Sequence, residues 1–384
     1  MTDSSVAVRL NPFKRPSGPL PILEGSSPVP WSPHGHILRE RPLFTLHPLF
    51  HAGCYYVQDS SAMFAGYQFR RALDSLEGIS CPRVLDLCAA PGGKTTDLAA
   101  SLREKFGDSF VLVSNEVMKD RSRILLDNVA RWGDPNVVVT SVDPAAFARM
   151  EGYFDIIVAD VPCSGEGMFR KDERAREEWS PEVVDLCAKR QKRILADVWP
   201  ALRDGGVLVY STCTYEDAEN DNNLRWAAET LGGEIIAPED LFSDYGVVLT
   251  SCGSLLRAGM VPGEGQWVGS MRKNGGSQRR DADVTILRPL RNGVVRGETK
   301  GKDFVPSADW ALSIDFDRSI YPEAALDKQT ALHYLHRDTI VLPDAPLGYN
   351  VVTYKGIVLG FVKNLGRRCN NMHPAARRII MDIK

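Results

Sequence analysis

Two cysteines are placed where they could take part in chemistry, because each follows an apolar run in a short polar turn. Cys163 follows FDIIVA in the turn DVPCSG, and Cys213 follows GVLVY in the turn STCTY. A lone cysteine is usually an inert buried group, but two in polar turns favour reactivity. A thiolate can add to carbon 6 of cytosine, which makes carbon 5 nucleophilic enough to accept a methyl group, and it can leave afterwards. A second thiol, or a water that it orients, can assist that release.

Acidic residues also follow apolar runs. Asp160 begins the turn that contains Cys163, and an acid there could stabilise the adduct at ring nitrogen N3 if burial raised its pKa. Glu116 closes another run and could accept hydrogen bonds from two ribose hydroxyls, while Asp143 could bind the amine of adenine. Each acid alone is more often a solvated group that caps a strand end. Three acids at successive strand ends favour a nucleoside site.

The segment VLDLCAAPGGKTTDLA has the pattern of a strand, a turn of small residues and the start of a helix. Its Ala and Gly residues let the backbone approach a ligand closely, and the helix presents its first amides to that ligand. A phosphate-binding P-loop would need Gly at the position of Cys88, and the dinucleotide pattern G-x-G-x-x-G is absent. The segment therefore predicts a ligand loop that is neither of these two kinds.

Short β-branched runs and longer amphipathic stretches alternate around these residues, which predicts strands joined by crossover helices. Runs such as FDIIVA are continuously apolar, as expected for strands that are covered on both faces. We expect an α/β fold with a Rossmann-like core, a mostly parallel sheet and helices on both faces. Ligands bind beyond the carboxyl ends of such strands, so the loop, the acids and both thiols should converge there. The expected strands are 84–87, 110–114, 137–140, 154–159 and 207–210, and the expected helices are 95–104, 120–132, 183–198 and 216–231.

The ends of the chain differ from this central region, which we place at 61–275. Residues 1–60 are rich in Pro and Gly with little periodicity, which predicts an extended or partly ordered lead-in. Residues 276–325 read as a basic linker, and residues 326–384 have the alternating, Gly-punctuated pattern of a small β domain with a basic tail. These basic residues could contact phosphates, although such runs are as often simply a solvated surface.

Bulk properties narrow the class of protein. The 384 residues carry a formal net charge of -3, which by itself gives no sign of a nucleic-acid partner. Eight scattered cysteines, a start without an apolar core and the lack of long apolar runs predict a protein of the reducing cytoplasm. His333 and His336 are one helical turn apart, but no third ligand is evident, so we expect no metal.

Five motifs occur together and in order: HAGCYYVQDSSAM, DLCAAPGGKT, SNEVMKDR, DVPCSGEGMFRKD and STCTYEDAEN. In these motifs the chain resembles the NOL–NOP–Sun family of RNA cytosine-5 methyltransferases, and within it the bacterial enzymes that act on small-subunit ribosomal RNA. The resemblance covers essentially the whole chain. It implies that S-adenosylmethionine is the cofactor, that the tail is a PUA-like RNA-binding domain and that RNA is the partner. We expect a monomer.

The resemblance also implies roles for single residues. Cys213 would be the nucleophile and Cys163 would help to release the product, while Lys94 and Asp160 would contact the target base. The cofactor would be held by Cys88, Ala89, Ala90, Pro91, Gly92, Gly93 and Lys94, together with Glu116, Arg121, Asp143 and Asp160.

The chain departs from the family pattern at two places. It begins at what resembles the last strand of the family's N-terminal RNA-binding region, so we expect that region to be represented by a remnant. Ala258 and Gly259 stand where the family tends to have a Pro-His pair.

Three other functions remain as alternatives. In a DNA cytosine-5 methyltransferase Cys163 would be the nucleophile, but that class does not need the thiol of STCTY, and the PUA-like tail favours RNA. Transfer RNA is a second possible substrate. An inactive ribosome-assembly factor is the third alternative, and the intact motif residues argue against it.

Overall fold

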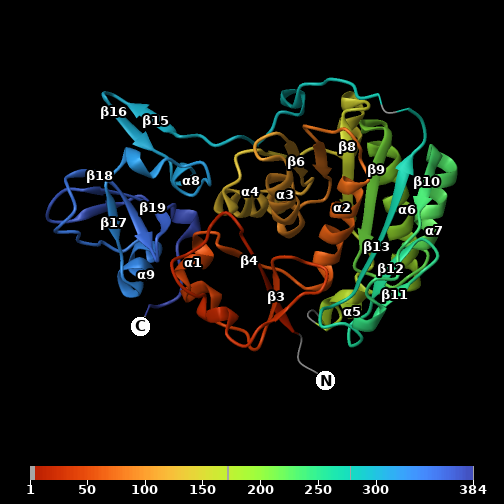
Figure 1. Cartoon of the computed structure of the whole chain (residues 1–384), viewed down its shortest axis with the longest axis horizontal. Helices are drawn as coiled ribbons and strands as arrows, with labels where there is room; N and C mark the ends of the chain where they lie inside the picture. The colour runs from red at the N-terminus through yellow and green to blue at the C-terminus, as the bar shows by residue number, and fades with distance from the viewer. Residues whose placement is uncertain (1–4, 171–172, 277, 384) are drawn as a thin grey trace.

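A sheet of ten strands is the largest sheet of the described residues, and its parallel part was expected from the sequence (Figure 1). The computed structural model describes residues 5–170, 173–276 and 278–383. Neighbouring strands run in the order β11-β12-β13-β9-β8-β5-β6-β7-β14, and β10 pairs with β13. The parallel strands are β5 (Arg83–Asp86), β6 (Val111–Asn115), β7 (Val137–Thr140), β8 (Phe154–Asp160) and β9 (Leu202–Thr212).

Antiparallel strands extend both edges of this sheet. On one side β13 pairs with β9, and on the other β14 pairs with β7. These strands are β10 (Gly233–Ile236), β11 (Val247–Leu249), β12 (Gly253–Leu256), β13 (Gln266–Lys273) and β14 (Arg291–Asn292).

Helices cover both faces of the sheet, which explains why its strands are apolar throughout. Neighbouring residues of one strand enter different cores, as Val84 and Leu85 do in β5. The core on one side includes residues of α2 (Phe64–Asp74), α3 (Gly93–Phe106) and α4 (Lys119–Trp132). The core on the other includes residues of α6 (Pro181–Val198) and α7 (Asp221–Ala227). A short helix, α5 (Glu173–Glu178), precedes α6.

The bounds of two helices follow from local chemistry. The side chain of Ser180 accepts a hydrogen bond from the backbone N–H of Val183, and Pro181 opens α6. Helix α4 ends at Trp132, and the capping residue Gly133 has a positive φ of 87°. A side chain at Gly133 would place its Cβ 2.1 Å from the carbonyl oxygen of Leu312, so only glycine fits this turn.

The N-terminal region is folded, which corrects the prediction of an extended lead-in. Its four-stranded antiparallel sheet has the order β2-β3-β1-β4. Local sequence patterns did not reveal this sheet because its strands pair across long loops, as Val8 does with Val57. The region comprises β1 (Val6–Leu10), β2 (Ser27–Pro28), β3 (Gly35–Leu38), α1 (Pro48–His51) and β4 (Tyr55–Val57).

The C-terminal region is a second small sheet, with the order β17-β18-β19-β20. It shares a core with the N-terminal region, in which Val8 and Leu49 pack with Leu335 and Leu359. Figure 1 shows the red N-terminal segments beside the blue C-terminal ones. The region comprises β17 (Glu323–Ala325), α9 (Lys328–His336), β18 (Gly348–Tyr354), β19 (Ile357–Asn364) and β20 (Cys369–Asn371).

The segment expected to be a linker contributes structure of its own. Besides β14 it forms a hairpin of β15 (Gly297–Lys300) and β16 (Asp303–Pro306), followed by α8 (Ala308–Ala311). Its arginines serve partly to hold the fold together: Arg279 lies 2.9 Å from Asp155, and Arg291 lies 3.3 Å from Asp309. In the described parts of the chain no helix has the length and apolar character to cross a bilayer.

The contribution of the buried ion pair of Asp155 to the stability of the fold can be measured. Its carboxylate lies 2.6 Å from the buried guanidinium of Arg203 and accepts a hydrogen bond from the backbone N–H of Arg83. We expect Asp155→Ala to lower the free energy of unfolding by about 3–5 kcal/mol, because it leaves the charge of Arg203 buried and unpaired. Urea unfolding followed by circular dichroism measures this loss.

The matched control is Asp185→Ala, which removes an exposed partner of Lys189 on α6. It should cost about 1 kcal/mol or less, because water screens the pair. Equal losses in the two variants would contradict the role given to Asp155.

Candidate active site

Functional side chains gather at the carboxyl ends of β5, β8 and β9. Asp86 ends β5, and Asp160 ends β8 in register with Ser211 of β9. Cys163 and Cys213 lie in the turns that follow β8 and β9. The structure therefore brings to one place the two turns that the sequence singled out.

The sulfur atoms of Cys163 and Cys213 are 3.1 Å apart, and neither residue is in a disulfide. The backbone N–H of Cys213 also points to the sulfur of Cys163 at 3.3 Å. Donation from the Cys163 thiol lowers the pKa of Cys213 although burial opposes it, and the same contact raises the pKa of Cys163. Cys213 is thus the thiol that ionises first, which suits a nucleophile.

A lysine and an aspartate lie beside the sulfur pair. The ammonium of Lys94 is 2.8 Å from the carboxylate of Asp160. Burial disfavours the charge on Lys94, but Asp160, together with Asp86 and Cys213, raises the pKa of Lys94 above its usual value. The charge on Lys94 in turn favours the thiolate of Cys213, while the charge on Asp160 and burial oppose it.

The other carboxylate oxygen of Asp160 is also bound. It accepts hydrogen bonds from the hydroxyl of Ser211 at 2.7 Å and from the side-chain amide of Gln266 at 3.2 Å. The sequence did not single out either residue. The role of Ser211 could have been predicted because this residue lies in the same motif as Cys213. The role of Gln266 could not, because Gln266 belongs to an antiparallel strand whose place in the sheet was not evident from the sequence.

The glycine-rich loop is tied to the sheet on one side and to α4 on the other. The backbone N–H of Ala89 donates to the carbonyl of Asn115, and the peptide bond between Ala90 and Pro91 is cis. Arg121 donates to the carbonyl of Ala90 at 2.7 Å, so this predicted cofactor residue supports the loop. Gly92 has a positive φ of 110°, and α3 begins at Gly93.

Two buried acids face this loop. Glu116 is 2% exposed, with one oxygen accepting from the backbone N–H of Met118 and Arg121 lying 3.3 Å from the other. Asp86 is fully buried, and burial raises its pKa to about 7. One of its oxygens accepts from Thr95, and the other has no hydrogen-bond partner in the described part of the chain.

Two other predicted cofactor residues have different surroundings. Asp143 is exposed, and its carboxylate accepts a hydrogen bond from the backbone N–H of Ala145, which caps a 3-10 helix at Pro144–Met150. Burial raises the pKa of Cys88, so its thiol stays protonated. Neither observation assigns these residues to a ligand.

The loop and its acids fit a nucleoside that carries a cationic amine. The small residues leave the backbone open to approach, Glu116 offers a buried acceptor for hydroxyl groups, and Asp86 offers an acceptor that lacks a partner. In contrast, no cluster of three or more His, Cys, Asp or Glu side chains in residues 5–170, 173–276 and 278–383 could hold a metal ion.

Two glutamates that the sequence analysis missed hold the two thiol turns in place. Glu219 accepts from the backbone N–H of Ser164 at 3.1 Å and from the amide of Gln191 at 2.6 Å. Glu166 accepts a hydrogen bond from the backbone N–H of Tyr215 at 2.9 Å, and this bond joins the turn of Cys163 to the turn of Cys213. Both glutamates lie inside recognised motifs, which was the available signal.

The two thiol turns also meet through their backbones. The N–H of Gly167 donates to the carbonyl of Cys213 at 2.8 Å, and a Cβ at Gly167 would lie 2.8 Å from that oxygen. Any other residue at Gly167 would therefore push the turns apart.

The basic residues expected to contact phosphates divide into two groups. Arg280 pairs with Glu151 at 2.5 Å, and Lys363 lies 3.4 Å from Asp303. Several arginines of the tail are instead exposed: Arg367, Arg368 and Arg378. Exposed cations are also present in the linker, at Arg288, Arg296 and Lys302, so both regions offer basic side chains to an anionic partner.

Three models of known protein regions match the chain in order. The model described as 16S rRNA methyltransferase RsmB/F matches residues 75–230. The N-terminal domain of 16S rRNA methyltransferase RsmF matches residues 1–60, and the methyltransferase RsmF PUA domain matches residues 321–379.

Curated relatives are similar over much of the chain. Ribosomal RNA small subunit methyltransferase F of Aliivibrio fischeri (strain MJ11) is 34% identical over 392 residues, which cover 86% of this chain and 80% of the relative. The protein of that name from Pectobacterium carotovorum subsp. carotovorum (strain PC1) is 35% identical over 254 residues, or 64% of this chain and 51% of the relative. The match thus spans about half the length of the Pectobacterium relative.

A solved structure supports the fold. A methyltransferase homologue from Pyrococcus horikoshii has a TM-score of 0.57 at 24% sequence identity, covering 71% of this chain and 87% of that one.

The contact between the two sulfur atoms leads to a prediction about the ionisation of Cys213. We expect Cys163→Ala to raise the pKa of Cys213, because it removes the hydrogen bond that lowers this pKa. The rate of alkylation of Cys213 by iodoacetamide, measured against pH by mass spectrometry, should show its midpoint at higher pH. Cys252→Ala, which removes a buried thiol elsewhere, should leave the midpoint in place. An unmoved midpoint in Cys163→Ala would show that the contact does not stabilise the thiolate.

Proposed function

The chain belongs to the family of ribosomal RNA small subunit methyltransferase F, and we propose from this membership that it methylates carbon 5 of a cytosine in small-subunit ribosomal RNA. The observation that carries the proposal is the pair of sulfur atoms 3.1 Å apart beside the ion pair of Lys94 and Asp160. Carbon 5 of cytosine is a poor nucleophile until a thiolate adds to carbon 6, and this site holds a thiol whose pKa is lowered.

The reaction begins when the thiolate of Cys213 forms a bond with carbon 6 of the cytosine. Negative charge then develops on the ring near N3, where the ammonium of Lys94, which the carboxylate of Asp160 holds in place, stabilises it. When bound, S-adenosylmethionine would supply an electrophilic methyl group, and carbon 5 would bond to that methyl as the bond between the methyl and the sulfonium sulfur breaks. The proton on carbon 5 then leaves to Cys163, once that thiol has given its own proton to water, or to a water that Cys163 orients. The bond between carbon 6 and the sulfur breaks, which regenerates the thiolate of Cys213.

The remaining assignments follow the same proposal. Glu116 binds the ribose hydroxyls of the cofactor and Asp143 its adenine, while Arg121 holds the loop through its bond to Ala90. Residues 61–275 carry the reaction, and residues 326–384 bind RNA. The loop that receives the cofactor consists of Cys88, Ala89, Ala90, Pro91, Gly92, Gly93 and Lys94.

Removing each thiol in turn tests the proposal. Cys213→Ala should abolish methylation of small-subunit ribosomal RNA, because no thiolate remains to attack carbon 6. Cys163→Ala should still attack but release product slowly, so a covalent complex of protein and RNA should accumulate. Transfer of a radioactive methyl group and a gel under denaturing conditions measure the two effects, and bisulfite sequencing locates the modified cytosine.

Cys81→Ala is the control for loss of a thiol outside the site and should behave as the unaltered protein does. If instead Cys213→Ala formed the stable complex and Cys163→Ala formed none, Cys163 would be the nucleophile and the proposed mechanism would be wrong. If the unaltered protein methylated transfer RNA or DNA but no ribosomal RNA, the proposed substrate would be wrong.

A further inference from the structure

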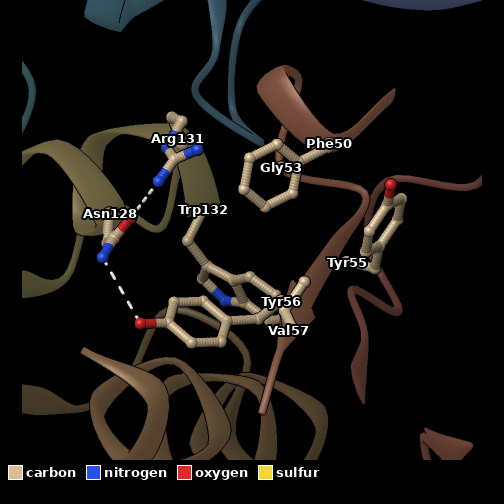
Figure 2. A pocket seen from close by; sticks show the side chains of 8 residues that line it. All are labelled: Phe50, Gly53, Tyr55, Tyr56, Val57, Asn128, Arg131 and Trp132. Atoms are coloured by element: carbon tan, nitrogen blue, oxygen red, sulfur yellow. Dashed lines mark hydrogen bonds between the residues drawn. The ribbon is translucent and has the colours of Figure 1, made fainter. Parts of the chain in front are cut away.

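A cavity of about 150 Å³ lies between α4 and the N-terminal region, away from the two thiols (Figure 2). The space is about ten times the 10–15 Å³ that one water needs. Aromatic rings dominate its wall, and among its lining residues there is one guanidinium and no carboxylate. The lining residues are Phe50, Gly53, Tyr55, Tyr56, Val57, Asn128, Arg131 and Trp132.

The rings are held in place by contacts outside the cavity. Trp132 is buried, and the fully buried guanidinium of Arg9 lies 4.8 Å from the centre of its ring. The hydroxyl of Tyr56 accepts a hydrogen bond from the amide of Asn128 at 3.3 Å. Figure 2 shows the side chains of Tyr56 and Trp132 beside each other and Phe50 across from Arg131. Fixed flat rings at the edge of a cavity are suited to stacking with another flat ring.

Arg131 gives the cavity its charge. Its guanidinium lies 4.9 Å from the centre of the Phe50 ring and donates to the side-chain oxygen of Asn128. In the described part of the chain no carboxylate lies within ion-pair distance of it, and the nearby Asp127 is paired with Arg377. Burial disfavours the charge on Arg131 and lowers its pKa, and Tyr56 and Asp127 compensate only in part. An anion beside it would supply that compensation.

Arg131 and Asn128 also line a second cavity of about 220 Å³, which adjoins the C-terminal region. His51 and His373 lie on its wall together with Arg377. The two cavities thus meet at Arg131 and follow α4 from the N-terminal region toward the C-terminal one. A chain of successive rings and anions fits this path better than a single small molecule does.

We propose that the aromatic cavity binds one unpaired nucleotide of the substrate RNA, with its base among Phe50, Tyr56 and Trp132 and its phosphate at Arg131. This inference rests on the proposed function, because it takes the RNA to be the substrate. The nucleotide is distinct from the cytosine that reacts, since the cavity is lined by none of the residues around the thiols. The cavity thereby adds a point of recognition to the RNA surface.

Photochemical crosslinking tests the proposal with the unaltered full-length protein. Unmodified small-subunit ribosomal RNA is prepared with 4-thiouridine in place of uridine, irradiated in the complex and digested, and crosslinked peptides are identified by mass spectrometry. We expect crosslinks within residues 50–57 and 128–132. Crosslinks confined to other parts of the protein would overturn the proposal.

Two substitutions give a second measurement. Phe50→Leu and Arg131→Gln should each raise the KM for RNA about tenfold, the effect of losing one stacked base or one phosphate contact, while kcat is unchanged. Their controls are Phe304→Leu on the exposed hairpin and Arg123→Gln on the solvent side of α4. Thermal unfolding of every variant confirms that it is folded.

The dissociation constant for S-adenosylmethionine separates this role from a structural one. Asn128 donates to the carbonyl of Pro91 at 2.6 Å, so a purely structural cavity would act through the cofactor loop. In that case Arg131→Gln would weaken cofactor binding and leave the KM for RNA unchanged, which would contradict the proposal. If the unaltered protein forms the expected crosslinks but no 5-methylcytosine, the proposed function fails and the cavity remains a nucleotide site. If it methylates RNA without these crosslinks, only the cavity proposal fails.

Discussion

The parallel register of β8 and β9 is the constraint on which the site depends. It sets Asp160 beside Ser211, and the two turns that follow are then close enough for their sulfur atoms to lie 3.1 Å apart. Such a register can be held only if both faces of the strands are covered, because buried parallel strands leave no polar face for water. The two helical layers are therefore a requirement of the chemistry as well as of folding.

The contact between the sulfurs also orders the proposed events in time. In the free protein the Cys163 thiol donates to Cys213, so Cys213 ionises first and Cys163 keeps its proton. Once Cys213 has bonded to carbon 6 its sulfur is an uncharged thioether. The largest cause of the raised pKa of Cys163 is then gone, so its thiol can lose its proton to water, and the resulting thiolate can accept the proton that leaves carbon 5. One short contact thus serves both halves of the proposed reaction.

Local patterns in the sequence were enough to predict the parallel sheet and the two thiol turns, because β8 and β9 are continuous apolar runs. Long-range pairing was not accessible in this way. The N-terminal sheet joins Val8 to Val57, and Gln266 reaches Asp160 only because β13 pairs antiparallel with β9. Charge alone was misleading as well: Arg279 and its neighbours were expected to meet phosphates, yet Arg279 binds the buried carboxylate of Asp155.

Helix α4 connects the parts of the molecule that must act together. At its start Arg121 holds the carbonyl of Ala90, and further along Asn128 holds that of Pro91. Near its end Asp127 pairs with Arg377 of the C-terminal region at 2.8 Å, and the buried ammonium of Lys14 donates to the carbonyl of Arg131 at 2.6 Å. A packed helix moves as a rigid unit, so these contacts cannot shift independently of one another. RNA bound along this helix would therefore contact the same element that shapes the cofactor loop. Binding of RNA could then change the affinity for the cofactor, and binding of the cofactor could change the affinity for RNA.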